Sequence, residues 1–246
     1  MAIPLFLAMT GAEFQFCEAL PEHIAWMACH FSPYGTGLSN LPPALPPGSL
    51  LILNDRIPIC RHNPEVIEQQ LQQIVEDHRC SGVVLDFQRK GIPETAQLAT
   101  HLAKAISCPV AVSDHYAQML DCPVFLPPCP HHTPLSEYIL SWKGRKLWLD
   151  LAVNAESITL TKTGTQILPL PLGEFPEGGH TDRLLHCHYS VETREDSARF
   201  ILWRTIEDME ALSGDAEKLG IENILSLFCE TRQQCKNRSG IIQSGC

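Results

Sequence analysis

A carboxylate and a carboxamide follow a short apolar run near the middle of the chain. The run covers 82–87, and Asp86 and Gln88 stand two residues apart at its end. Residues two apart on a strand point to the same face, so both side chains are expected on one surface. Such a pair can orient a polar ligand, and a carboxyl group can also transfer a proton. We therefore take Asp86 and Gln88 as candidate catalytic residues.

Other acidic residues stand at the ends of predicted strands or in the loops that follow them. If those strands form one barrel, several would face a common mouth and line a polar pocket for a sugar or a metal. Asp114 or Asp55 could then serve as the acid in place of Gln88. For Asp86 this interpretation and that of a simple polar strand end are evenly matched. For each of the other carboxylates taken singly, we favour the interpretation as a simple polar strand end. The carboxylates are Asp55, Asp86, Asp114, Asp150 and Glu230.

Further polar side chains at the same predicted strand ends are candidates for binding a substrate. They are His30, Asp55, His115, Tyr116 and Asp150.

Cysteine and histidine also occur close together, as in zinc sites. His186 and His188 are predicted to share one strand face. No spacing matches a zinc ribbon or an HExxH helix, so we interpret these groups as incidental and expect no metal and no cofactor. GxSxG, P-loop and GxGxxG patterns are also absent. The groups are Cys29–His30, Cys60–His62, Cys129–His132 and His186–His188.

The elements that would position these residues alternate between helix and strand. Asn63-Pro64-Glu65 is a strong helix start, and apolar residues then recur at helical spacing over 64–78. A second helix pattern covers 94–107, and another lies at about 134–142. This rhythm predicts an α/β barrel of the (β/α)8 TIM type, which binds ligands at the carboxyl ends of its strands. Strands are predicted at 2–9, 22–31, 50–55, 82–87, 108–114, 122–126, 146–152 and 220–228.

The rhythm changes after the seventh predicted strand. Residues 157–168 alternate polar and apolar around Lys162-Thr163-Gly164, which predicts an antiparallel hairpin. A loop over 169–183, strands at 184–190 and 199–203, and a helix from Thr205 follow. Thr205 and Asp208 have the spacing of a capping box. We expect one barrel domain over 1–230, with an antiparallel insertion at 155–204 and a polar tail at 231–246.

The strand at 82–87 resembles the fourth-strand signature of family 18 glycoside hydrolases, Asp-Gly-x-Asp-x-Asp-x-Glu. The signature falls on Ser81, Gly82, Val84, Asp86 and Gln88, of which Gly82 and Asp86 agree. The resemblance implies a chitinase-like barrel, with Gln88 in the place of the general-acid Glu. An amide cannot supply the proton that a carboxylic acid supplies.

The later part of the chain also resembles this family in the order of its elements. A strand that ends within Phe200–Thr205 is followed by a helix and then by the last strand. The family's Tyr at the sixth strand end and Trp on the last strand are not evident.

The composition of the chain limits the kinds of binding partner and the cellular compartment that we expect. The 246 residues carry a formal net charge of −10, without the basic face that nucleic acid or an anionic membrane requires. The apolar first residues lack a positive segment, which favours a strand over a signal peptide. Eleven cysteines without a CxxC pair favour free thiols in a reducing cytoplasm. The oligomeric state is not defined by the sequence.

Three hypotheses remain open. The first is a family-18-like barrel that binds or hydrolyses a carbohydrate. The second is a non-catalytic barrel used for binding or assembly. The third is a metal-dependent hydrolase with His and Asp ligands at the strand ends.

Overall fold

The structure is a computed structural model that describes residues 3–35, 37–59, 63–171 and 179–231. It divides into two compact units. The first comprises the described residues up to Pro127, together with Gly144–Asp150 and Gly220–Cys229. The second comprises Pro128–Lys143, the described part of Leu151–Leu219, and the described residues from Glu230.

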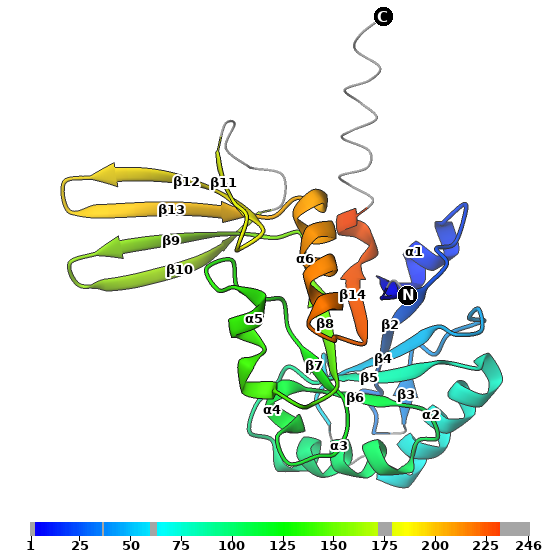
Figure 1. The fold of residues 1–246 in the computed structure, drawn as a ribbon. Helices are drawn as coiled ribbons and strands as arrows, with labels where there is room; N and C mark the ends of the chain where they lie inside the picture. The colour runs from blue at the N-terminus through cyan, green and yellow to red at the C-terminus, as the bar shows by residue number, and fades with distance from the viewer. Residues whose placement is uncertain (1–2, 36, 60–62, 172–178, 232–246) are drawn as a thin grey trace, which may run out of the picture. The chain divides into compact units, whose positions relative to one another are not determined.

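The first unit is a closed barrel of eight parallel strands (Figure 1). Strand β1 pairs with both β2 and β14, so the sheet has no free edge along this seam. The TIM-type barrel predicted from the alternating pattern is therefore confirmed. Its strands are β1 (Leu5–Met9), β2 (Ile24–Phe31), β4 (Leu50–Asn54), β5 (Gly82–Asp86), β6 (Val110–Ser113), β7 (Val124–Leu126), β8 (Leu147–Leu151) and β14 (Asn223–Leu227).

Small and large side chains together fill one buried cluster of the barrel. Ala8, Ala25 and Ala111 lie in this cluster with the larger Trp148, which is 2% exposed. Gly82 is required by this packing, because a Cβ atom there would lie 2.5 Å from Cη2 of Trp148. A glycine at the start of β5 therefore leaves room for the indole ring.

Two long helices of the barrel unit lie close to the predicted positions. Helix α2 (Pro64–His78) begins as expected, since Oδ1 of Asn63 accepts a hydrogen bond from the Glu65 amide at 2.9 Å. Helix α3 (Pro93–Ala105) follows β5. Two shorter helices lie in the same unit, α1 (Gly11–Phe16) and α4 (Asp114–Ala117).

One strand of the barrel unit was not predicted. Strand β3 (Leu38–Ser39) pairs antiparallel with the end of β2, in the segment between the predicted strands 22–31 and 50–55. Two residues are too few for a recognisable alternation, so this strand has no signal of its own.

The second unit contains a five-stranded sheet in the order β10-β9-β13-β12-β11 (Figure 1). The antiparallel insertion predicted after the seventh barrel strand is confirmed. Helix α6 (Ile206–Lys218) begins with the expected capping box between Thr205 and Asp208. A short helix α5 (Leu135–Tyr138) and the 3-10 turn η1 (Leu140–Trp142) replace the single helix predicted there. The strands are β9 (Ala155–Thr161), β10 (Gly164–Leu170), β11 (His180–Asp182), β12 (Cys187–Arg194) and β13 (Ser197–Trp203).

Some boundaries in this sheet differ from the prediction. Strand β10 continues through Pro169, and β11 lies within the predicted loop. Pro169 is tolerated because β10 is an edge strand, where a missing amide donor costs no ladder hydrogen bond. Strand β12 begins at Cys187, later than predicted, because His186 adopts a positive φ of 46° and ends the preceding turn.

All eight cysteines among the described residues are outside disulfides, and Cys60, Cys235 and Cys246 lie outside that part of the chain. In the segments that the structure describes, no helix is long and apolar enough to cross a membrane.

Candidate functional site

A cavity of about 1060 Å³ opens at the carboxyl ends of the barrel strands. Its wall includes residues at or just after the ends of β2, β4, β5, β8 and β14. Five of the predicted site residues line it: His30, Asp55, Asp86, Gln88 and Asp150. The cavity is large enough for a sugar chain of a few units.

Asp86 and Gln88 contact each other on this wall. The side-chain amide Nε2 of Gln88 donates a hydrogen bond to Oδ1 of Asp86. Burial raises the pKa of Asp86 above its ordinary value, and the nearby charge of Asp55 acts in the same direction. The Gln88 hydrogen bond and the charge of His115 partly oppose that shift.

Asp55 is a structural anchor for the loop that carries Gln88. Its Oδ1 accepts the backbone N–H of Gln88 at 2.9 Å, and its Oδ2 accepts that of Arg89 at 3.0 Å. The residue is only 3% exposed. Both carboxylate oxygens are therefore engaged with the backbone, so Asp55 does not fit the role of a replacement acid that the sequence allowed.

The same loop is held from its other side by β6 and α4. Ser113 Oγ accepts the Phe87 amide at 2.9 Å and donates to the carbonyl of Leu85 at 3.0 Å. The Tyr116 hydroxyl donates to the carbonyl of Arg89 and accepts the Ile92 amide at 3.3 Å. The backbone from Leu85 to Ile92 is thus fixed at several points, which sets the position of Gln88.

His30 also has an ordered place on the cavity wall. Its Nδ1 lies 2.8 Å from the carbonyl oxygen of Phe31, and its Nε2 lies 3.0 Å from Nδ2 of Asn40. A carbonyl requires a donor and an amide nitrogen requires an acceptor. This arrangement fits a donor at Nδ1 and an acceptor at Nε2.

Asp114, His115 and Tyr116 do not line the cavity. The sequence placed them at the end of a strand, but β6 stops at Ser113 and Asp114 is the first residue of helix α4. Asp114 Oδ1 accepts the backbone amide of His115 at 2.8 Å and lies 3.0 Å from its Nδ1. Tyr116 supports the loop, as described above, and His115 acts on Asp86 through its charge.

The sequence prediction missed several polar cavity residues, among them Asn54, Arg56 and Arg89. Asn54 Nδ2 donates to the carbonyls of Met27 and Cys29, each at 3.0 Å, where the pairing of β2 with β4 shifts register. Arg56 and Arg89 line the mouth of the same cavity. A polar residue at the end of the apolar run 50–53 was a usable signal for Asn54, whereas exposed arginines carry no such signal.

The remaining predicted polar residues lie in the second unit. Glu230 accepts the backbone amide of Val153 at 2.8 Å, so its carboxylate holds a segment that is distant in the sequence, and it is not among the residues that line the cavity. His186 binds Asp215 at 2.7 Å and His188 binds Asp208 at 3.3 Å. These two histidines do not share a strand face, because His186 precedes β12.

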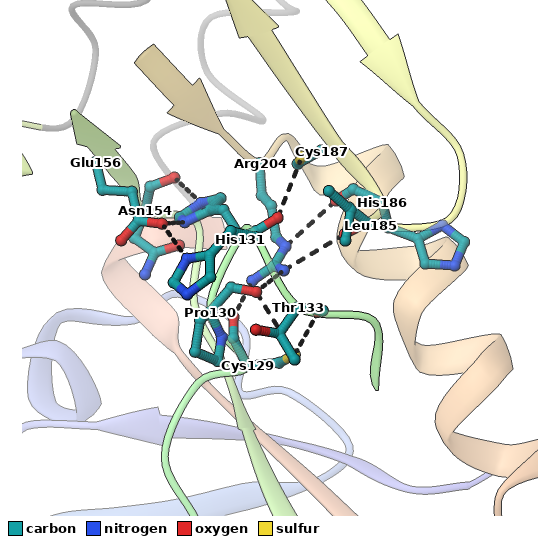
Figure 2. A network of polar contacts seen from close by, with 11 residues as sticks. Cys129, Pro130, His131, Thr133, Asn154, Glu156, Leu185, His186, Cys187 and Arg204 are labelled. Carbon is teal, nitrogen blue, oxygen red and sulfur yellow. Dashed lines mark hydrogen bonds and ion pairs between the residues drawn. The ribbon is translucent and has the colours of Figure 1, made fainter. Parts of the chain in front are cut away.

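A buried polar network surrounds Arg204 in this unit (Figure 2). The guanidinium donates to the carbonyls of Cys129, Pro130, Leu185 and His186, and the residue is 1% exposed.

The loop that contains Cys129 and Pro130, whose carbonyls bind Arg204, also forms ion pairs. Nδ1 of His131 lies 3.3 Å from Oε1 of Glu156, and Nδ1 of His132 lies 3.5 Å from the same oxygen (Figure 2 labels His131 and Glu156). These interactions lower the pKa of Glu156. Within the described ranges, no group of three His, Cys, Asp or Glu side chains is arranged to hold a metal ion, and Cys60 and His62 lie outside those ranges.

The fold and cavity define an α/β barrel of the TIM type that has its candidate binding site at the carboxyl ends of the strands. More specifically, the fold is that of family 18 glycoside hydrolases. A family 18 N-acetylglucosaminidase from Paenibacillus barengoltzii matches with a TM-score of 0.58 and 11% identity, over 91% of this chain and 94% of that one.

Two further solved structures have a similar fold. A mutant family 18 chitinase from Cycas revoluta, in complex with (GlcNAc)4, has a TM-score of 0.57 and 9% identity over 90% and 94% of the two chains. The chitinase-like agglutinin RobpsCRA from Robinia pseudoacacia has a TM-score of 0.52 and 12% identity over 90% and 93%. No sequence-family model and no curated protein matches this chain.

Proposed function

We propose that the chain is a carbohydrate-binding barrel that does not carry out the hydrolysis typical of family 18 enzymes. The observation that carries this proposal is the hydrogen bond from Gln88 to Asp86 on the wall of an open cavity. Gln88 stands where the family signature has its acid, and a carboxamide has no proton to give to a leaving group. The site therefore keeps polar groups for binding and lacks the expected acid.

The cavity wall supports binding of a sugar. It combines hydrogen-bonding side chains, such as His30 and Asn40, with apolar side chains, such as Leu41 and Phe125. Sugars need both kinds of contact, because their hydroxyl groups alternate with apolar ring faces. A chitinase-like agglutinin and a chitinase bound to (GlcNAc)4 have a similar fold, which makes N-acetylglucosamine oligomers the first ligands to test.

The direct test is calorimetric titration of the protein with (GlcNAc)4, followed by analysis of the sugar for cleavage. We expect saturable binding without cleavage. Asp86→Ala should weaken binding by about tenfold, because one good polar contact is worth roughly 1.4 kcal/mol. Asp121→Ala, at an exposed acidic residue outside the cavity, is the matched control and should bind as the wild type does. Absence of binding would refute the proposal.

Hydrolysis with Asp86 as the acid is the second candidate function. The raised pKa of Asp86 favours its protonated form, and Asp150 supplies another carboxyl group in the same cavity. This alternative predicts that the wild type cleaves (GlcNAc)4 and that Asp86→Asn does not. The cleavage analysis therefore distinguishes the two functions.

A further inference from the structure

We propose that Arg56 and Arg89 form a binding site for an oxyanion at the mouth of the cavity, and that the sugar ligand carries a carboxylate or sulfate group there. This inference rests on the proposed carbohydrate binding and specifies the class of sugar. The two arginines line the same cavity as Asp86 and Gln88.

The two arginines are direct neighbours. Arg56 follows β4 and Arg89 follows β5, two strands that pair in parallel along their whole length. Nη2 of Arg89 donates a hydrogen bond to the backbone carbonyl of Arg56 at 3.1 Å. Both residues are exposed, so their guanidinium groups are accessible to a ligand that enters the cavity.

The backbone under both side chains is held independently of the guanidinium groups. The Arg89 amide donates to Oδ2 of Asp55 at 3.0 Å, and its carbonyl accepts the hydroxyl of Tyr116. The Arg56 amide donates to Oδ1 of Asn54 at 3.2 Å. Fixed backbone positions reduce the entropy that an arginine loses when it binds a ligand.

Within the part of the chain that the structure describes, neither guanidinium is paired with a carboxylate. The ion pairs among the described residues do not include Arg56 or Arg89. This is unexpected in a chain with 28 acidic and 18 basic residues, where acidic partners are in excess. Two positively charged side chains that line one cavity repel each other, and an anion bound between them would offset that repulsion.

The charges of the cavity also suggest how such a ligand would lie. Asp55, Asp86 and Asp150 line the same cavity, and the two oxygens of Asp55 are occupied by backbone amides. An anionic group is attracted by the arginines, so it would bind beside Arg56 and Arg89. The uncharged hydroxyl and acetamido groups would then face Asp86 and Gln88. Guanidinium groups bind planar carboxylates and sulfates through paired hydrogen bonds.

The experiment compares three matched tetrasaccharides by calorimetry at low salt: neutral (GlcNAc)4, the same sugar oxidised to a carboxylate at C6, and the same sugar sulfated at O6. We expect the carboxylated or the sulfated form to bind at least about tenfold more tightly than the neutral one. That preference should shrink as salt is added. The sugar that binds more tightly, carboxylated or sulfated, shows which oxyanion the site prefers.

Arg56→Gln and Arg89→Gln should each reduce the preference, and the double variant should abolish it while neutral (GlcNAc)4 still binds. Arg194→Gln is the matched control, since Arg194 is exposed at the end of β12 and does not line the cavity. Thermal melting of each variant checks folding. Equal affinity for all three sugars, or a preference that survives in the folded double variant, would overturn the inference but leave carbohydrate binding intact. Failure of all three sugars to bind would overturn the proposed function and this inference with it.

Discussion

Gln88 donates a hydrogen bond from its side-chain Nε2 to Oδ1 of Asp86, the residue two positions before it. The two side chains thus form a pair on the wall of the cavity, where one is an acid and the other an amide. An acid in place of the amide would face a carboxyl group at hydrogen-bonding distance. Two carboxyl groups that close share a proton, so the pKa of one of them would be raised.

The first prediction follows from this geometry. Gln88→Glu should create hydrolysis of (GlcNAc)4, at a rate at least about a hundredfold above that of the wild type, because general acid catalysis contributes that much. The rate is measured by chromatography of the released sugars. Gln15→Glu makes the same chemical change elsewhere on the cavity wall and should have no effect. A folded, sugar-binding Gln88→Glu protein without activity would argue against the assignment of Gln88 to the acid position.

The second prediction concerns the anchoring role of Asp55. Asp55→Asn replaces one acceptor oxygen by an N–H donor, which would face the backbone amide of Gln88 or Arg89. We expect the free energy of unfolding to fall by about 2 kcal/mol, the cost of leaving a buried donor without its acceptor. Urea denaturation measures the loss. The exposed Asp121→Asn should change stability by less than about 0.5 kcal/mol, and an equally stable Asp55→Asn protein would contradict the anchoring role.

The third prediction uses the raised pKa of Asp86. Between the ordinary value near 3.8 and the raised value, the folded state binds more protons than the unfolded state, so stability falls as pH rises through this window. Asp86→Asn removes this titration but keeps an oxygen that can accept from Gln88. The variant should therefore gain stability relative to the wild type between pH 4 and neutral pH, as measured by melting temperature. A difference that is constant with pH would contradict the shift.

The fourth prediction concerns thiol reactivity. Burial raises the pKa of Cys29 to about 12, whereas Cys229 is exposed and lies two residues after the last barrel strand. Because the thiolate is the reactive form, Cys29 in the folded protein should be alkylated at least about a hundredfold more slowly than Cys229. Mass spectrometry of peptides after a timed iodoacetamide reaction at pH 8 gives both rates. In urea the two rates should converge, and similar rates in the folded state would contradict the burial of Cys29.

The fifth prediction tests the network in Figure 2. Arg204 donates to four backbone carbonyls, and the ammonium group of a lysine cannot reach all of them from one point. Arg204→Lys should therefore reduce the free energy of unfolding by about 2 kcal/mol, measured by urea denaturation. Arg194→Lys, at an exposed position, should leave it unchanged. An unaffected Arg204→Lys protein would show that the guanidinium contacts add little to stability.

The site was only partly predictable from the sequence. The contact between Asp86 and Gln88 was predictable because both stand at the end of one apolar run, so it needs only the geometry of that segment. The backbone contacts of Asp55 were not predictable, since its partners, the amides of Gln88 and Arg89, lie more than thirty positions away. Asp114 was misplaced because the chain turns into helix α4 one residue earlier than the apolar pattern suggests.

The sequence by itself determined the eight barrel strands, the two long helices of the barrel unit and the order of these elements. Apolar runs define the strands, and the Asn63 cap and the Thr205–Asp208 capping box define where two helices begin. These features depend on neighbouring residues, so they can be read locally. The tertiary structure decided which strand ends share the cavity, which carboxylate holds the β5–α3 loop, and that Arg56 and Arg89 are neighbours at its mouth. Those relationships depend on strand register and on the path of each loop, which bring together residues far apart in the chain.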